Sequence, residues 1–421
     1  MSWGKALLIL LGLGALALGA PTLLDRAGPV PDGARPAAGT PEQIERGRQL
    51  ALAGNCAVCH TARGGAPYAG GRAIGTPFGT VYAGNLTPDE ATGLGRWSAD
   101  HFWRALHEGR GFDGRRLVPA FPYTEFTRLT RADSDALYAW LRTLPPVAQP
   151  DRAHELRWPY GTQTALAAWR LAFFRAGSWV DDASKSAEWN RGAYLVNGLG
   201  HCGACHTPRN AFGAEQDGSA HLSGAVVDGW EAPPLTALSH APLPWTEADL
   251  FDYLRHGHSA RHGSATGPMA PVVQQLAQLP DADVRAMATY LVSFNDTAPT
   301  STLPAQAPPA NDAAHRLFTT ACGACHHDGS GPLLLGQNIA LERNTNLHSA
   351  RPDNLLRVIL EGVQDPASPQ QGFMPSFRDA FDDAQVAQLA AYLRQRFAPQ
   401  QPAWRDLEAA SRRVRATPSS H

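Results

Sequence analysis

The sequence predicts an all-α protein of three tandem domains, and two observations support this prediction. The motif Cys-x-x-Cys-His occurs three times, at residues 56–60, 202–206 and 322–326, and these copies contain all six cysteines of the 421-residue chain. Each copy also follows one run of helical periodicity and precedes another, so the chain repeats a single helical unit. The opening runs are Pro41–Gly54, Ala187–Leu199 and Asn311–Ala321, and the closing runs are Asp133–Leu144, Asp281–Phe294 and Asp383–Phe397.

The three closing runs share a short pattern near their ends. Each has an aromatic residue followed by leucine in the same register: Trp140 with Leu141, Tyr290 with Leu291, and Tyr392 with Leu393. Because a shared register places these pairs on equivalent helical faces, we expect them to pack on the opening helices.

The composition narrows the class of function. Lysine and arginine number 36 against 38 acidic residues, and no long block of one sign occurs. Because phosphate binding needs a concentrated basic face, we do not expect nucleic acid as a partner. Glycine (40) and proline (34) are abundant. This suits small modules that contain much irregular chain and whose interior is partly filled by something other than side chains.

The three cysteine motifs predict covalently bound haem. Two thiols about one helical turn apart can each bond one vinyl group of the same porphyrin, and the adjacent histidine is then held under the iron. Structural zinc would need a further ligand at every copy, and a redox dithiol has no use for a histidine after all three. We therefore predict three covalent haem c groups, attached at Cys56, Cys59, Cys202, Cys205, Cys322 and Cys325, with His60, His206 and His326 as axial ligands.

A second repeat predicts the other axial positions. A glycine ends an equivalent stretch in each repeat, at Gly109, Gly257 and Gly362, and the residues twelve positions later are Phe121, Met269 and Met374. Both methionines stand beside prolines, in a loop downstream of the histidine, where a thioether can close the sixth position of the iron. The alternative is that these methionines fill the core, and we favour the ligand role.

The first repeat lacks such a ligand. No methionine lies between Met1 and Met269, so haem one has no thioether from its own domain. Two alternatives remain: Phe121 covers the iron and leaves it five-coordinate, or His101 or His107 binds it. We favour the first alternative, which predicts a lower potential for this haem than for a His/Met site.

The N-terminus predicts export. The run Ala6–Ala20 is apolar and follows Lys5, and it is short for a spanning helix but typical of a signal sequence. Extended to Leu24, the run is long enough for an uncleaved anchor. The small residues Ala17, Gly19 and Ala20 favour cleavage. Export agrees with the motifs, since bacteria are expected to attach haem outside the cytoplasmic membrane.

Several stretches of the first two repeats resemble a known family. They are Gly70–Gly71, Thr76–Thr80, Asn85–Pro88, Ser186–Tyr194 and Gly198–Asn210. The chain is similar, over about residues 40 to 400, to the tri-haem cytochrome c subunits of membrane-bound bacterial dehydrogenases of the quinoprotein alcohol, gluconate and fructose dehydrogenase type. It departs from the alcohol dehydrogenase pattern at Phe121, where that pattern has methionine.

The last repeat resembles a second group. The stretch Arg351–Leu360 and the tail Pro402–Leu407 are similar to cytochromes paired with molybdenum hydroxylases. The resemblances imply three class I cytochrome c domains, each wrapped round one covalent haem, which we call modules one to three. The expected boundaries are a signal peptide or anchor at 1–24, module one at 40–150, a linker with an apolar helix at 151–184, module two at 185–298, a Pro/Ala linker at 299–309, module three at 310–399 and a tail at 400–421.

The family resemblance also implies a function. It implies an electron-transfer subunit on the periplasmic side of the bacterial cytoplasmic membrane, with no catalytic residue of its own. Electrons would come from a quinoprotein, flavoprotein or molybdenum hydroxylase subunit and pass to ubiquinone or a terminal oxidase. The alternative is a haem peroxidase or small-ligand sensor that uses an open iron at haem one, for which Glu125 and Arg116 are candidate distal groups.

Two segments are candidates for membrane or partner contact. The apolar stretch Thr162–Ala176 is interpreted as a packing helix between modules, with contact to a membrane surface as the alternative. In the tail, Trp404, Leu407, Ser411 and Val414 share one helical face beside several arginines, and a docking helix and a solvated tail both remain open.

Overall fold

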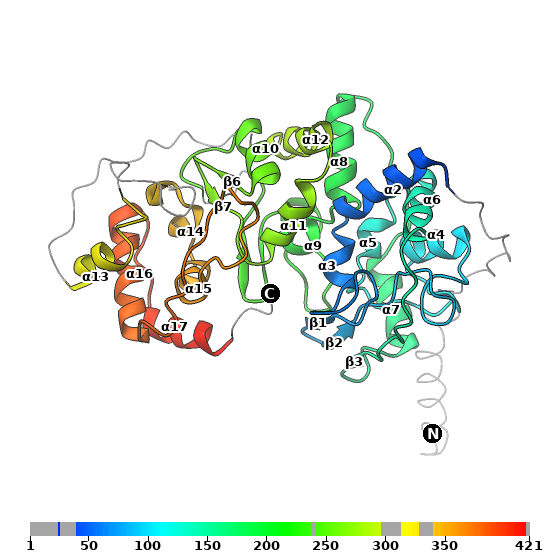
Figure 1. Cartoon of the computed structure of the whole chain (residues 1–421), viewed down its shortest axis with the longest axis horizontal. Coiled ribbons are helices and arrows are strands. Elements are labelled where there is room, and N and C mark those ends of the chain that lie inside the picture. Colours follow the sequence, from blue (N-terminus) through cyan, green and yellow to red (C-terminus); the bar gives the residue numbers. More distant parts are fainter. Residues whose placement is uncertain are drawn as a thin grey trace, which may run out of the picture. The chain divides into compact units, whose positions relative to one another are not determined.

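The computed structural model describes residues 24–25, 39–236, 239, 241–295, 313–327 and 340–417. The chain forms two compact units (Figure 1). The first unit contains the described residues up to Asp182 together with Tyr194–His201 and Asn210–Ala214, and the second contains the remainder. The predicted signal or anchor, apart from Leu24, and the predicted linker at 299–309 lie outside the described residues.

In the first unit, the opening and closing helices cross at a glycine. Helix α2 (Pro41–Ala53) begins with a capping box between Thr40 and Gln43 and packs on α6 (Arg131–Leu141). A Cβ atom on Gly47 would lie 2.0 Å from the Ala136 carbonyl oxygen and 2.7 Å from the Trp140 Cβ, so only glycine permits this approach. Trp140 therefore packs on the opening helix, as the register predicted.

Short elements complete the first unit between and after these helices. The helices are α3 (Cys56–His60), α4 (Ala99–Glu108), α5 (Tyr123–Phe126) and α7 (Gln163–Phe173). The prediction of an all-α fold missed a three-stranded antiparallel sheet of β1 (Ala73–Thr76), β2 (Gly79–Tyr82) and β3 (Glu155–Leu156), in which Ala73 pairs with Tyr82 and Gly79 with Leu156. The sheet is small, and the described chain is mainly helical.

The second unit repeats the glycine crossing. Gly192 of α8 (Ala187–Asn197) packs on α12 (Asp281–Val292), where a Cβ atom would lie 1.9 Å from the Ala286 carbonyl oxygen and 2.9 Å from the Tyr290 Cβ. The elements between these helices are α9 (Gly203–His206), the 3-10 turn η1 (Gly218–Ala220), β4 (Ala225–Val227), β5 (Trp230–Ala232), α10 (Glu247–His256), β6 (His258–Ser259), β7 (Gly263–Ser264) and α11 (Met269–Leu276).

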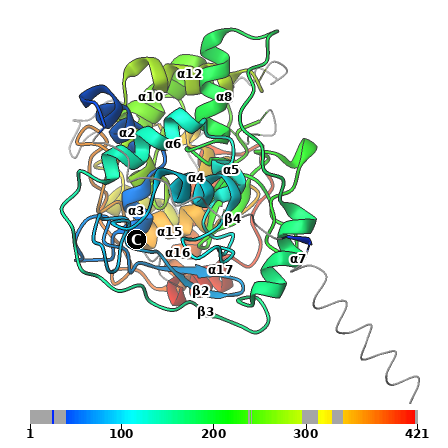
Figure 2. The ribbon, with the colours of Figure 1, turned by 90° about the vertical axis from the view of Figure 1, so that its right-hand side faces the viewer.

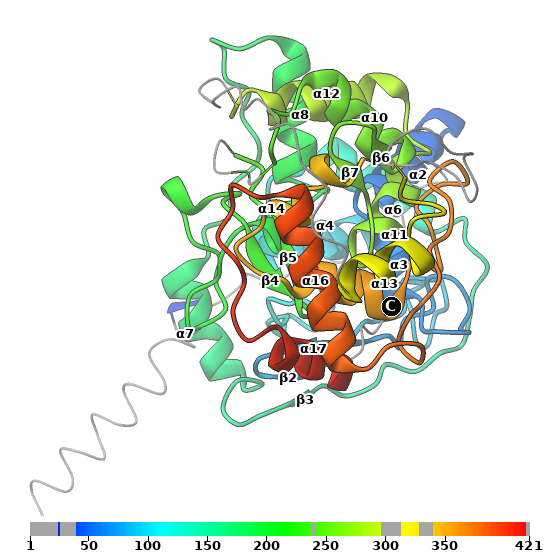
Figure 3. The ribbon, with the colours of Figure 1, turned by 90° about the vertical axis from the view of Figure 1, so that its left-hand side faces the viewer.

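The third repeat also belongs to the second unit. Its elements are α13 (Ala313–Ala321), η2 (Leu341–Arg343), α14 (Thr345–His348), α15 (Asp353–Glu361), α16 (Asp383–Phe397) and α17 (Leu407–Ala416). Tyr392 packs on Phe318 of the opening helix with 5.6 Å between ring centroids, so the third aromatic pair also behaves as predicted. The buried core joins Phe318 to α15, α16 and α17 (Figure 3).

The C-terminal tail forms a packed helix. Ala410, Ser411 and Val414 of α17 are buried, and Ser411 donates a 2.7 Å hydrogen bond to Asp383 of α16. Arg413 pairs with Asp353 at 3.0 Å. The apolar face of the tail is thus covered by module three itself, which argues against a solvated tail and also against a helix that uses this face to dock on a membrane or a partner.

Inside the second unit, side chains of module three donate hydrogen bonds to backbone carbonyl oxygens of module two. Asn354 of α15 donates to the Glu231 carbonyl oxygen at 2.9 Å, and Arg357 donates to the Gly229 carbonyl oxygen at 3.0 Å. Gln371 donates to the Ala265 carbonyl oxygen at 2.7 Å. Side chains of module three therefore hold β5 and the loop before Met269. Among the residues described, we find no helix with the length and apolar character needed to cross a membrane.

Candidate haem sites

The histidines of the first two motifs have the same environment. The Nδ1 atom of His60 lies 2.7 Å from the Gly84 carbonyl oxygen, and that of His206 lies 2.7 Å from the Pro233 carbonyl oxygen. Nδ1–H donation to a carbonyl fixes the tautomer that leaves Nε2 with a free lone pair, which is the form that binds iron. Burial lowers the pKa of both histidines, which also favours the neutral ligand form.

The third histidine has a buried, unsatisfied ring nitrogen. The Nδ1 atom of His326 makes no hydrogen bond, and residues 328–339, which follow it closely, lie outside the described part of the chain. Burial lowers its pKa as well. The third motif therefore shows a partly buried imidazole whose pKa is lowered, as in the first two motifs.

The first cysteine of each motif does not have the properties of a redox thiol. Burial raises the pKa of Cys56 and Cys202 to about 12 and that of Cys322 to about 11. A catalytic dithiol or a zinc-binding thiolate needs the opposite shift. Across the described residues, no group of three or more potential ligands is arranged to hold a metal ion. The raised pKa values of these thiols argue against the zinc and dithiol interpretations.

The surroundings of the first motif fit a haem. Cys56, Tyr68, Leu86, Trp97 and Phe121 are partly buried and pack against the apolar core of module one. This donor set, two thiols and one oriented imidazole beside apolar side chains, is what a covalent porphyrin requires. The residues around the first motif therefore fit a covalently bound haem.

The segments that lead to Phe121 and Met269 have one register in modules one and two. Gly109 and Gly257 both adopt positive φ (61° and 79°) after α4 and α10. The Gly109 carbonyl accepts from the Leu117 amide at 2.9 Å, and the Gly257 carbonyl accepts from the Ala265 amide at 2.7 Å. Phe121 and Met269 each lie four residues beyond these amides, so they occupy equivalent positions, as the count from the sequence predicted.

The third loop closes differently. Gly362 follows α15 with φ 72°, and Met374 pairs with Val363 in an isolated bridge, in which the Val363 amide donates to the Met374 carbonyl at 2.9 Å. The register of Met374 relative to its glycine is therefore held by other bonds than in the first two modules. Met374 and Met269 are both partly buried, and their iron ligation stays a prediction.

The two alternative ligands of haem one have other contacts. His101 caps the start of α4, where its Nδ1 lies 2.8 Å from the Ser98 hydroxyl, and its ring stacks on Phe112 at 4.6 Å. The Nδ1 of His107 lies 2.8 Å from the Thr127 carbonyl oxygen, and its ring stacks on Trp103. The Nδ1 contact of His107 leaves its Nε2 lone pair available, as in His60 and His206, so these contacts do not decide between Phe121 and a histidine at the sixth position of haem one.

The structure adds two aromatic residues to module two that the sequence did not single out. A Cβ atom on Gly267 would lie 2.5 Å from the ring of Trp230, so this buried indole packs directly on the loop that carries Met269. The Trp230 Nε1 has no hydrogen-bond partner. His262, in the turn between β6 and β7, stacks on Trp245 at 3.8 Å. No local motif marks either residue, because their partners lie far along the chain.

Comparisons with known proteins agree with this geometry. Residues 44–145 and 190–295 match the family described as cytochrome c, and residues 309–393 match the family described as cytochrome c oxidase, cbb3-type, subunit III. Cytochrome c domains hold haem c covalently, so the chain is a haem c protein. The match covers all three cysteine motifs.

Three relatives are informative. The chain is 52% identical to a nicotinate dehydrogenase subunit of Pseudomonas putida, over 90% of this chain and 32% of the relative, so it spans about a third of that protein. It is 36% identical to the fructose dehydrogenase cytochrome subunit of Gluconobacter japonicus, over 86% of this chain and 81% of the relative. It is 35% identical to the cytochrome c subunit of the quinone alcohol dehydrogenase of Gluconobacter oxydans, over 83% of this chain and 78% of the relative. With its covalent haem motifs and near full-length similarity to two such subunits, the chain belongs to the cytochrome c subunits of membrane-bound dehydrogenases.

Proposed function

We propose that this protein carries electrons from a dehydrogenase catalytic subunit through three covalent haem c groups to ubiquinone or a terminal oxidase, on the periplasmic side of the cytoplasmic membrane. The observation that carries the proposal is the repeated histidine environment, in which His60 and His206 each direct Nδ1 to a backbone carbonyl at 2.7 Å. A bound haem supplies a one-electron carrier whose iron alternates between two oxidation states.

The residues of this chain would hold each haem by thioether bonds and set its potential. We propose His60, His206 and His326 as axial ligands, with Met269 and Met374 on the opposite side of haems two and three. A thioether ligand raises the reduction potential and leaves no open position, which suits a carrier. Phe121 offers no ligand atom, so haem one is proposed as five-coordinate, with the lowest potential.

The proposed electron donor is a dehydrogenase of the nicotinate-oxidising type. The identity of 52% to the nicotinate dehydrogenase relative exceeds the 36% to the fructose dehydrogenase relative. The peroxidase alternative gains no support, because Arg116 binds Asp25 at 2.6 Å and Glu125 accepts from the Thr124 hydroxyl at 2.6 Å. Both candidate distal groups are thus engaged elsewhere.

The test uses the full chain with haem attached. We expect three haems per chain by pyridine haemochrome assay, and two in a Cys322→Ala/Cys325→Ala variant. We also expect reduction of the haems on mixing with a nicotinate-type dehydrogenase and its substrate, followed by reoxidation with a soluble ubiquinone analogue. Two haems in the unaltered chain, or haems that stay oxidised with every dehydrogenase tried, would contradict the proposal.

A further inference from the structure

An exposed aromatic surface lies on the first unit. We use this name for Phe78, Trp158, Tyr160, Leu171, Phe173 and Phe212. Trp158 is 85% exposed and Phe212 63% exposed, and Tyr160, Leu171 and Phe173 are also exposed. These side chains come from the turn between β1 and β2, from the segment before α7, from α7 itself and from the loop after the second motif.

The members of the aromatic surface touch one another. Phe78 and Tyr160 lie 4.7 Å apart between ring centroids, and Phe173 and Phe212 lie 5.8 Å apart. A Cβ atom on Gly213 would lie 2.8 Å from the Phe78 ring, so the segment that carries Phe212 also contacts Phe78. These contacts link Phe78, Tyr160, Phe173 and Phe212 into one patch, and Trp158 and Leu171 each stand two residues before a member of it in the sequence. Soluble monomers rarely leave such a patch uncovered, and tryptophan and tyrosine favour the headgroup region of bilayers.

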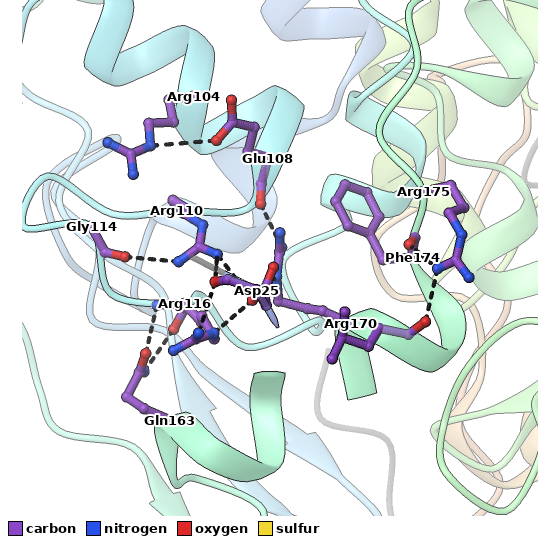
Figure 4. Close-up of polar contacts among 11 residues, drawn as sticks. Asp25, Arg104, Glu108, Arg110, Gly114, Arg116, Gln163, Arg170, Phe174 and Arg175 are labelled. Atoms are coloured by element: carbon purple, nitrogen blue, oxygen red, sulfur yellow. Dashed lines mark hydrogen bonds and ion pairs between the residues drawn. The ribbon is translucent and has the colours of Figure 1, made fainter. Parts of the chain in front are cut away.

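Helix α7 also binds the start of the described chain (Figure 4). The carboxylate of Asp25 lies 3.0 Å from Nε of Arg170 on α7, 2.6 Å from Nε of Arg116 and 3.0 Å from Nη2 of Arg110. The three arginines are buried. Burial alone would raise the pKa of Asp25, but hydrogen bonds from Arg116 and Arg170 and the arginine charges lower it. A carboxylate shared by three buried guanidinium groups is firmly held.

This contact involves the residue next to the N-terminal apolar run. The run Ala6–Leu24 ends immediately before Asp25, and Leu24 is 74% exposed. Because Asp25 is bound to Arg170, the residue that directly follows the run is held on the helix that carries Leu171 and Phe173. Helix α7 can be followed in Figure 2. Helix α7 thus carries two members of the aromatic surface and binds the residue that directly follows the apolar run.

The charges beside the aromatic surface are basic. Arg157 precedes Trp158 and hydrogen-bonds the Pro77 carbonyl, and Arg175 follows Phe173 and donates to the Leu171 carbonyl at 2.8 Å. Both arginines are exposed. Arginine at the rim of an apolar patch suits phosphate headgroups of anionic lipid.

We propose that the aromatic surface rests in the headgroup region of an anionic bilayer, with the Asp25 contact holding the N-terminal run at the same place. This inference depends on the membrane location in the proposed function and assigns it to named residues. A bilayer, rather than the catalytic subunit, is the occupant because exposed arginines border the aromatic surface and Asp25, which directly follows the apolar run in the sequence, is bound to the same helix. Module one would then face the lipid that holds the quinone.

The test is hydrogen–deuterium exchange of the full haem-loaded chain, with and without vesicles of phosphatidylglycerol and phosphatidylethanolamine. We expect backbone amides of residues 157–175 and 210–214 to exchange more slowly on vesicles. Trp158→Ser/Phe173→Ser should abolish this protection. Where the N-terminal run is cleaved, the double variant should also weaken vesicle binding roughly 10-fold or more, because two large apolar groups leave the interface.

The matched control is Val226→Ser, which removes a half-exposed apolar side chain of β4 outside the aromatic surface. This variant should keep both vesicle binding and the protection. Unchanged exchange of residues 157–175 on bound vesicles would overturn the proposal, and so would protection that needs the catalytic subunit instead of lipid. Reduction by the dehydrogenase is measured on the same samples. Loss of reduction with protection intact would count against the proposed function alone.

Discussion

The hydroxyl of Tyr194 donates a 2.6 Å hydrogen bond to Oδ2 of Asp133, 61 residues earlier in the chain. Oδ1 of the same carboxylate lies 2.5 Å from Nε of Arg46, so one buried carboxylate joins the opening and closing helices of module one to Tyr194 within the first unit. Burial, and then the charge of Asp133, raises the pKa of Tyr194 far above its usual range. The hydroxyl therefore stays protonated and keeps donating at any pH that the fold tolerates.

This contact predicts a loss of stability on removing the carboxylate charge. We expect Asp133→Asn to reduce the stability of the first unit by about 1.5–3 kcal/mol, the usual cost of breaking a hydrogen bond to a buried charged group. Calorimetry of the haem-loaded chain would show this loss as a lower unfolding temperature of the first unit. Asp113→Asn is the control, because Asp113 is exposed and its arginine lies 3.9 Å away. Equal shifts in the two variants would contradict the prediction.

The methionine ligands can be tested by replacing a thioether with a side chain of similar volume. Met269→Leu and Met374→Leu should each lower the potential of one haem by roughly 100 mV or more, within the wide range that axial ligands control. Each variant should also gain one haem that binds carbon monoxide. Met287→Leu serves as the control, since Met287 is buried within α12 and should change neither property. A potentiometric titration that leaves all three haems unchanged in Met269→Leu would refute its ligand role.

The phenylalanine at position 121 predicts the effect of adding a methionine ligand to haem one. In the unaltered protein we expect one of three haems to be high-spin and to bind carbon monoxide, because Phe121 supplies no ligand atom. Phe121→Met should abolish that binding and raise the potential of this haem, since Phe121 and Met269 share one loop register. Absorption and magnetic resonance spectra provide the measurement. Three low-spin haems in the unaltered protein would show that another residue, such as His107, closes the iron.

His262 predicts how the stability of the second unit depends on pH. Burial lowers the pKa of His262 from 6.5 to about 4, against the opposing effect of Asp249, 3.5 Å away. The unfolded chain therefore binds a proton at a higher pH than the folded chain does. Stability should fall as the pH drops from about 7 toward 4, by at most about 3 kcal/mol, and then level off.

A substitution isolates this effect. His262→Phe keeps a ring against Trp245 and removes the titrating group, so its stability should fall less over the same pH range. Urea unfolding of the haem-loaded chain at pH 7, 5.5 and 4.5 would measure both slopes. Parallel slopes for the two proteins would assign the pH dependence to other groups.

The helical elements could be predicted closely from the sequence, because their end signals are local. The closing run Asp383–Phe397 coincides with α16, which begins after the capping residue Asp382. The opening run Ala187–Leu199 ends two residues late, since the helix stops at Asn197 before Gly198. The register of Phe121 and Met269 was also predictable, because it depends only on a glycine and a fixed count.

Features built from distant residues could not be predicted in the same way. Strand β2 is only four residues long and is completed by β3, more than seventy positions later. No periodicity marks such short strands. The binding of Asp25 to Arg170 spans 145 positions and depends on how α7 folds back on module one. Long-range ion pairs of this kind leave no signal in a single sequence.

The hydrogen bonds from Arg357 and Gln371 to carbonyl oxygens of module two have a practical consequence for dissecting the chain. A two-haem fragment that ends in the segment 299–309 would lose both donors and expose the Gly229 and Ala265 carbonyls to water. Its spectra would then report a loosened pocket rather than the native one. Individual haems are better removed from the intact chain, by replacing one pair of attachment cysteines at a time.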